Sequence, residues 1–186
     1  MGGGVRRGAR QGWRDLRPVF IDFEASGTTG WPIEVGWAEV VGGEVVSESR
    51  LIRPEPDWDE GEWDPLAEEV HGLPLDRLLR EGEAARAVAA RLLAVLRGRT
   101  AVSDTAPFDA AFLRGLLEAH GGEVEEPRIV DAAALRGLMD EGAAARFDAA
   151  LAAAPTGHRA GGDAARLALA WRAALRSIMQ APETCR

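Results

Sequence analysis

The segment FIDFEASG, residues 20–27, places two carboxylates two positions apart inside an apolar run. Alternate residues of a strand project from the same face of a sheet, so Asp22 and Glu24 are expected to stand side by side near a core. An unpaired buried charge costs several kcal/mol or more, and two like charges also repel each other. We therefore expect a cation at this position, together with further ligands from elsewhere in the chain.

Two later segments carry side chains that suit this site. Asp109 lies in SDTAPFDAAFL, and His158 and Asp163 lie in GHRAGGDAARLA. Each has a simpler explanation when taken alone, because an aspartate often stabilises a helix N-terminus and a single histidine is usually a surface or capping residue. Taken together, they fit a different role. Hard divalent cations such as Mg²⁺ prefer oxygen ligands, two such ions can bind both reacting oxygens of a phosphodiester, and a neutral histidine can accept the proton of the attacking water.

In this order and spacing, the three segments resemble the three exonuclease motifs of the DEDDh family of 3′–5′ exonucleases. Relatives in that family include the proofreading subunit of bacterial replicative polymerase and the oligoribonucleases. Two smaller segments agree with the resemblance, PIEVG at residues 32–36 and HGL at residues 71–73. The resemblance extends over about residues 18–176 and implies a ribonuclease H-like fold.

The resemblance also implies a role for individual residues. The four metal-binding carboxylates of the family, which hold two Mg²⁺ or Mn²⁺ ions, fall on Asp22, Glu24, Asp109 and Asp163, and the general base falls on His158. The candidate substrate-adjacent residues are Ala25, Ser26, Gly27, His71 and Ser103.

One position departs from the family pattern. Relatives usually carry His-Asn ahead of the second motif, where this chain has Ser103 and Asp104. Asp104 adds negative charge near the expected phosphate path, which would alter substrate choice or affinity. The alternative is that Ser103 and Asp104 only cap the helix that follows.

The activity implied by the resemblance is metal-dependent removal of nucleotides from the 3′ end of single-stranded DNA or RNA, with release of nucleoside 5′-monophosphates. The alternative is a non-catalytic module that binds nucleic-acid ends or a polymerase partner. A strand that ends in D-x-acid also resembles the haloacid dehalogenase-like phosphatases. Those enzymes use a second aspartate and a later lysine, whereas this chain has Glu24 and contains no lysine.

The order of elements predicts an α/β fold, a mixed five-stranded sheet with three antiparallel strands followed by two parallel strands, flanked by helices. The Gly42-Gly43 pair predicts a hairpin between the second and third strands. Residues 54–82 read as irregular, with one short helical turn, and only an Ala-rich turn is expected over residues 145–153. Helices are expected at about residues 83–97, 107–120 and 161–178.

Composition and charge set the domain plan. We expect a flexible Gly/Arg-rich tail at residues 1–17, one exonuclease domain at residues 18–178 and a C-terminal tail at residues 179–186. The chain has a formal net charge of −8, and because residues 1–17 hold five arginines and one aspartate (+4), the remainder carries −8 − 4 = −12. Affinity for duplex nucleic acid comes mostly from neutralising phosphates, so this acidic body favours 3′ ends and short oligonucleotides as partners.

The remaining expectations are general. No apolar run approaches the roughly 18 residues of a membrane span, and a cytoplasmic location is the default. A homodimer is compatible with the sequence, which contains nothing that decides the oligomeric state. Three tryptophans fall in expected loops, where they would stack on bases or pack against the protein itself: Trp31, Trp58 and Trp63.

Overall fold

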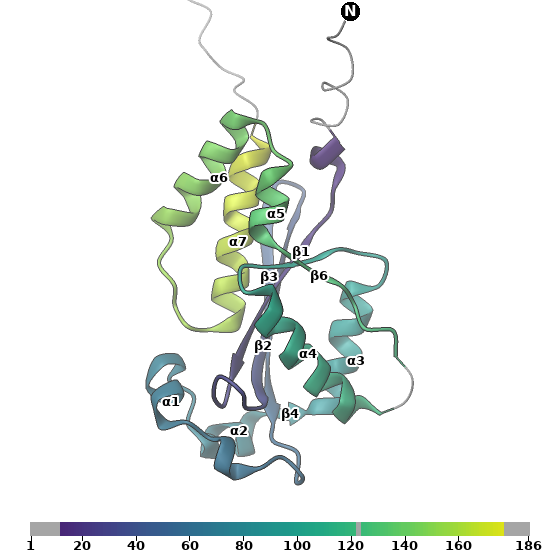
Figure 1. Cartoon of the computed structure of the whole chain (residues 1–186), viewed down its shortest axis with the longest axis vertical. Helices are drawn as coiled ribbons and strands as arrows, with labels where there is room; N and C mark the ends of the chain where they lie inside the picture. Colours follow the sequence, from purple (N-terminus) through teal and green to yellow (C-terminus); the bar gives the residue numbers. More distant parts are fainter. Residues whose placement is uncertain (1–11, 122–123, 177–186) are drawn as a thin grey trace, which may run out of the picture.

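The computed structural model describes residues 12–121 and 124–176, which form a mixed six-stranded sheet flanked by helices (Figure 1). The strand order is β4-β3-β2-β1-β5-β6. Strands β1, β2 and β3 pair antiparallel, and β5 and β6 continue the sheet in parallel on the other side of β1. The strands are β1 Val19–Ala25, β2 Pro32–Val41, β3 Glu44–Arg53, β4 Glu83–Ala84, β5 Ala101–Ser103 and β6 Ile129–Asp131.

The predicted fold class is therefore confirmed, with one strand more than expected. The additional strand is β4, whose two residues pair parallel with Ile52 and Arg53 at the end of β3. Strand β4 immediately precedes helix α3. Residues 83 and 84, which were predicted to start that helix, therefore extend the edge of the sheet instead.

Helices cover both faces of the sheet. One face is packed by α5 (Ala132–Gly137), α6 (Glu141–Ala153) and α7 (Ala160–Leu175), and the other by α3 (Ala85–Leu96) and α4 (Ala106–His120). Helices α1 (Pro65–His71) and α2 (Leu75–Glu81) lie together at the lower end of the view in Figure 1. Two short 3₁₀ turns complete the described elements, Gly12–Asp15 and Glu60–Glu62.

The expectation of a mere turn over residues 145–153 is wrong, because this segment belongs to the 13-residue helix α6. The Asp140 side chain caps the helix by accepting a hydrogen bond of 2.9 Å from the Ala143 amide. Ala143, Ala144 and Phe147 then form a buried face against the core. Alanine is the best helix former, so the Ala-rich composition extends the helix once the cap starts it.

Strand β1 is buried on both faces, and its alternation decides where the carboxylates point. Ile21 and Phe23 pack into the core that faces α3 and α4, whereas Phe20 packs into the core beneath α5–α7. Asp22 and Glu24 share the parity of Phe20. The two carboxylates therefore belong to the face of the sheet covered by α7.

The packed domain begins earlier than the predicted boundary at residue 18. Trp13 is only 2% exposed, and its ring centroid lies 5.3 Å from that of Trp171 in an edge-to-face arrangement. Residues 12–17 are thus part of the domain, because this indole is buried in the core under α7. Residues 1–11 of the N-terminal tail expected at residues 1–17, and the C-terminal tail expected at residues 179–186, lie outside the described residues. Within the described part of the chain, no helix is long and apolar enough to cross a membrane.

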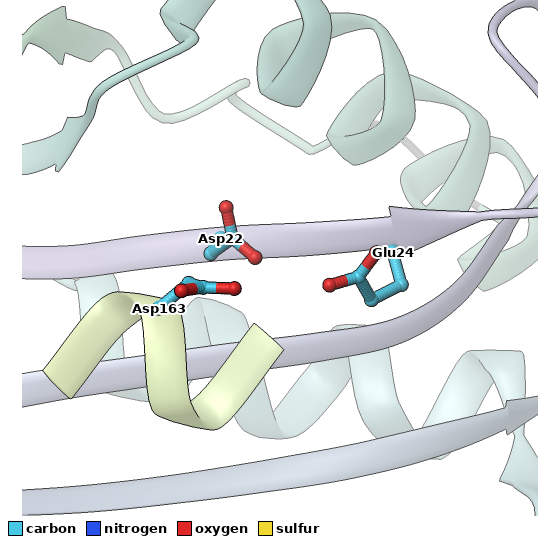
Figure 2. Close-up of side chains that lie close together, drawn as sticks. All are labelled: Asp22, Glu24 and Asp163. Carbon is cyan, nitrogen blue, oxygen red and sulfur yellow. The ribbon is translucent and has the colours of Figure 1, made fainter. Parts of the chain in front are cut away.

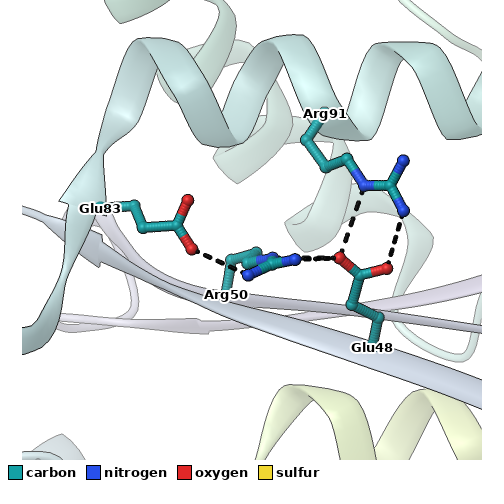
Figure 3. Close-up of polar contacts among 4 residues, drawn as sticks. All are labelled: Glu48, Arg50, Glu83 and Arg91. Carbon is teal, nitrogen blue, oxygen red and sulfur yellow. Dashed lines mark hydrogen bonds and ion pairs between the residues drawn. The ribbon is translucent and has the colours of Figure 1, made fainter.

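A network of charged side chains joins strand β3 to helix α3 (Figure 3). Glu48 of β3 accepts hydrogen bonds from Arg91 of α3 and from Arg50, and Arg50 also pairs with Glu83 at 3.1 Å. The bond from Arg91 lowers the pKa of Glu48. Exposed ion pairs contribute little individually, so we expect this network to add little to stability.

Candidate active site

Three of the four predicted acidic residues come together in one cluster. Asp22 and Glu24 extend from β1 and Asp163 extends from the first turn of α7, with ligand oxygens that all lie within 4.8 Å of one another. In Figure 2 the three carboxylates point into the same space between strand and helix. The same-face placement of Asp22 and Glu24 was predicted from their spacing, and the cluster agrees with it.

A close backbone approach at Gly36 brings α7 to the strand. Gly36 of β2 is the cross-strand partner of Asp22. A Cβ atom built on Gly36 would lie 2.1 Å from the carbonyl carbon of Ala160 and 2.2 Å from the amide nitrogen of Gly161. Only a residue without a side chain permits this contact, which places Asp163, one turn into α7, next to Asp22. The glycine of the PIEVG segment is therefore a geometric requirement of the cluster.

The cluster concentrates negative charge in a partly buried place. Burial and the nearby charges of Asp109 and Glu24 raise the pKa of Asp22 from 3.8 to about 9. Burial and the charge of Asp163 raise the pKa of Glu24 from 4.5 to about 7. Across residues 12–121 and 124–176, no ion pair joins any of the three carboxylates to an arginine or histidine. An all-oxygen donor set with unpaired negative charge fits a hard divalent cation.

Asp109 lies beside the cluster, but its carboxylate is occupied by protein donors. The side chain is 1% exposed; Oδ1 accepts a hydrogen bond of 3.1 Å from the Phe23 amide, and Oδ2 accepts bonds from the hydroxyls of Ser103 and Thr105. These donors tie the start of α4 to β1. Asp109 is therefore placed to act on the site through its charge on Asp22, and its coordination of a metal stays a prediction.

Two predicted substrate-adjacent residues are buried, and their hydroxyl groups are hydrogen-bonded within the protein. Ser103 is 0% exposed, and its hydroxyl donates to Asp109 while it accepts from the Thr105 amide at 2.9 Å. Ser26 is also 0% exposed, and its hydroxyl accepts a bond of 2.9 Å from the Trp31 amide. Both hydroxyl groups are therefore hydrogen-bonded within the protein and support the site, and contact of the substrate with the backbone at Ser26 or with Ser103 stays a prediction. Gly27 is buried as well, which leaves Ala25 partly open.

The departure at Asp104 has a structural partner that the sequence did not indicate. Asp104 forms an ion pair of 3.4 Å with Arg166 of α7, and Arg166 also donates to the Ala154 carbonyl at 3.0 Å. The negative charge of Asp104 is thereby partly balanced, although it still contributes to the raised pKa of Asp22. The N-cap residue of α4 is Thr105, whose side chain makes no cap bond; Ser103 accepts a bond from the Thr105 amide and so supports this helix start, whereas Asp104 pairs with Arg166.

His158 is exposed in the loop between α6 and α7 and has a left-handed backbone conformation, with φ of 48°. Its neighbours are held by the cluster itself, because the Gly157 and Arg159 amides donate to the two carboxylate oxygens of Asp163 at 3.2 and 3.3 Å. The loop therefore lies directly against one of the predicted metal ligands, as the motif implied.

His71 is buried at 5% exposure, and its Nδ1 accepts a bond of 3.0 Å from the Leu73 amide. Burial lowers the pKa of His71, which favours the neutral ring. The three tryptophans pack against one another, which is the second of the two roles expected for them. The Trp31 ring stacks on that of Trp58 with centroids 5.3 Å apart, and its centroid lies 5.6 Å from that of the Trp63 ring. His71 and these three indoles form a support under the loop that follows β1.

A cavity of about 460 Å³ lies between the loop that follows β1 and the start of α4. Its wall includes Thr28 and Thr29 from the loop and Pro107, Phe108 and Phe112 from the helix. The ring of Phe108 is 56% exposed although its neighbour Asp109 is buried. The sequence did not single out Phe108, and the only signal was an aromatic residue directly before a predicted site acid.

The raised carboxyl pKa values predict how the metal-free protein responds to pH. A group with a raised folded-state pKa holds its proton in the folded protein after the unfolded chain has lost it, so stability falls as pH rises through that window. For Asp22 the window extends from about pH 4 to about pH 9. We expect the melting temperature in chelator to fall between about pH 5 and pH 8, and Asp22→Asn to flatten this slope. A melting temperature that rises across the same range would contradict the assignment.

Comparison with known proteins agrees with the architecture. No protein-family model and no curated protein matches the sequence. Among solved structures, E. coli exonuclease I bound to a dA16 oligonucleotide superposes with a TM-score of 0.63 at 17% identity, over 84% of this chain and 40% of that one. A zinc-bound complex of the same enzyme with single-stranded DNA gives 0.60 at 18% identity, again over 84% and 40%. Exonuclease X in complex with 5′-overhanging duplex DNA gives 0.58 at 18% identity, over 85% of this chain and 90% of that one.

These matches show a shared nuclease-like fold. The chain spans about 40% of the length of exonuclease I, and nearly the whole length of exonuclease X.

Proposed function

We propose that this protein is a metal-dependent DEDD-type exonuclease that removes nucleotides from the 3′ end of a nucleic-acid strand. The observation that carries the proposal is the cluster of Asp22, Glu24 and Asp163, in which three carboxylates from β1 and α7 converge without a basic partner among the described residues. The motif resemblance and the exonuclease folds support the same conclusion. Because the similar structures contain single-stranded or overhanging DNA, DNA ends are the first substrate class to test.

The chain's own groups divide the work between them. Asp22, Glu24 and Asp163 would hold Mg²⁺ or Mn²⁺, with two ions as the family resemblance implies, and bound ions would supply charge neutralisation at the scissile phosphate. Asp109 adds charge beside Asp22 and fixes the strand–helix junction. His158, exposed next to Asp163, is the group available to accept the proton of the attacking water.

The cavity between the loop that follows β1 and the start of α4 is the place that we propose for the terminal nucleotide. Phe108 offers an exposed aromatic face of the kind on which bases stack without sequence preference. Thr28 and Thr29 also line the cavity, and Ala25, the last residue of β1, directly follows Glu24 in the chain. We assign the base of the last nucleotide to this cavity and its phosphate to the carboxylate cluster.

The test is a time course on matched 5′-labelled single-stranded DNA and RNA oligonucleotides with Mg²⁺ or Mn²⁺. We expect the labelled strand to shorten stepwise as a ladder, nucleoside 5′-monophosphates to accumulate, and EDTA to stop the reaction. Comparison of the two substrates measures the preference between DNA and RNA. Sustained cleavage in EDTA, or internal cuts from the outset, would sink the proposal, and binding of ends without shortening would favour the non-catalytic module.

A further inference from the structure

We propose that Glu34 and Arg159 form a positioning pair that holds the His158 loop in its working conformation, an inference that rests on the proposed exonuclease function. Neither residue was selected from the sequence as part of the site. The signal for Glu34 was a single acid within the apolar strand segment PIEVG, and Arg159 directly follows the predicted base. The pair joins the centre of the sheet to the loop that carries His158.

The contact is buried on one side and geometrically complete. Glu34 is 1% exposed in β2. Its Oε2 accepts a hydrogen bond of 2.9 Å from Arg159 Nε, and its Oε1 accepts one of 2.9 Å from Arg159 Nη2. The Ala160 amide donates to Oε2 at 3.2 Å, so the same carboxylate also holds the first residue of α7. A planar guanidinium that makes two parallel hydrogen bonds to a carboxylate fixes the relative orientation of the two side chains, in addition to stabilising their contact.

The rest of the loop is anchored at points on either side of His158. Arg166 donates to the Ala154 carbonyl at the start of the loop, and the Gly157 and Arg159 amides donate to Asp163. Within residues 12–121 and 124–176, no hydrogen bond holds the His158 imidazole itself. The loop backbone therefore sets the position from which the imidazole extends, and at His158 this backbone occupies the left-handed region that non-glycine residues rarely adopt.

Burial of the Glu34 carboxylate beside the acidic cluster costs free energy of folding, and a positioning role for the Glu34–Arg159 pair would explain why it is there. Glu34 is the cross-strand partner of Glu24, so it adds a further carboxylate next to an already acidic cluster. The charge of Glu34 contributes to the raised pKa of Glu24, and the charge of Arg159 lowers that pKa. Buried ion pairs are weak contributors to stability, since desolvation offsets their attraction, and their best-attested use is to specify one geometry. The geometry specified here is that of the residue next to His158.

The first arm of the test is a double-mutant cycle on the rate of cleavage. We expect Arg159→Gln to lower kcat by about 10- to 100-fold with little change in KM, because a displacement of about 1 Å of a catalytic group costs rates of that order. In a His158→Ala background the same change should cost less than about 3-fold, because the group being positioned is gone. Arg159→Lys keeps the charge but not the fork, and should remain impaired. Arg136→Gln breaks an exposed pair with Asp148 on α5 and α6 and serves as the matched control, with wild-type kcat expected.

The second arm needs no activity and follows amide hydrogen exchange in the loop, residues 154–160. We expect Glu34→Gln and Arg159→Gln to raise exchange at the Gly157 and Arg159 amides by about 10-fold or more, and Arg136→Gln to leave it unchanged. Additive losses of kcat in the cycle, or unchanged exchange in both variants, would overturn the inference. If the wild-type protein cleaves no nucleic acid, the proposed function fails on its own, and the exchange measurement alone decides whether the pair holds the loop.

Discussion

Replacement of Asp22 by asparagine should abolish cleavage and remove the thermal stabilisation produced by Mg²⁺ or Mn²⁺. Asp22 is one of the three acids of the cluster, each of which offers a ligand oxygen within 4.8 Å of the other two. A metal ion contributes several kcal/mol of charge stabilisation to the transition state, which corresponds to a loss of about 10³-fold or more in kcat. Cations that bind only the folded protein raise its melting temperature, and without Asp22 that shift should be largely lost.

For the metal-free protein, Asp22→Asn is not expected to lower the melting temperature. At about pH 8 the folded protein must keep the Asp22 proton, because its pKa is raised to about 9, and this lowers stability; asparagine does not ionise and avoids that cost, so in EDTA Asp22→Asn should melt no lower than wild type. Asp148→Asn, which alters an exposed acid on α6 outside the cluster, is the control and should keep both activity and metal response. If Asp22→Asn still responds to Mn²⁺ as wild type does, Asp22 is not a ligand and the site has been placed wrongly. Asp163→Asn is the companion test, with the same two losses expected.

Replacement of His158 by alanine should separate catalysis from metal binding. The imidazole is exposed in the α6–α7 loop, whereas the carboxylates that would hold the metal come from β1 and α7. Loss of a general base typically lowers the rate by about 10²–10⁴-fold, and we expect a loss of that size in kcat. The metal-induced shift in melting temperature should survive, because no ligand oxygen has been removed.

His120 is the matched control for this variant. It is also a histidine at the surface, but it lies at the end of α4, where its ring contacts the Arg86 carbonyl at 3.3 Å. His120→Ala should cleave at the wild-type rate. Cleavage by His158→Ala at a near wild-type rate would show that the loop histidine is a bystander, and a lost thermal shift would show that it affects the metal ligands instead.

Much of the cluster was determined by local sequence. The D-x-E spacing in an apolar strand places Asp22 and Glu24 on one face, because strand side chains alternate with a period of two. The helix starts that carry Asp109 and Asp163 were also readable, since Pro107 and the apolar periodicity of each helix mark them. The same local rules predicted the order of antiparallel and parallel strands, because a hairpin is signalled by its turn glycines and a crossover by its helix.

Other features were decided only by tertiary structure, because they depend on which distant segments meet. The pairing of Glu34 with Arg159 joins residues 125 positions apart, and nothing local to either residue specifies its partner. Likewise, the protein donors around Asp109 and the cavity at Phe108 arise only where α4 meets β1 and the loop after it. The alternation of side chains along a strand decides which face of the sheet a side chain takes. The approach of α7 to Gly36, in contrast, sets the distances between the carboxylates. Those distances, and the burial they produce, give Asp22 and Glu24 their raised pKa values, a property that no sequence spacing contains.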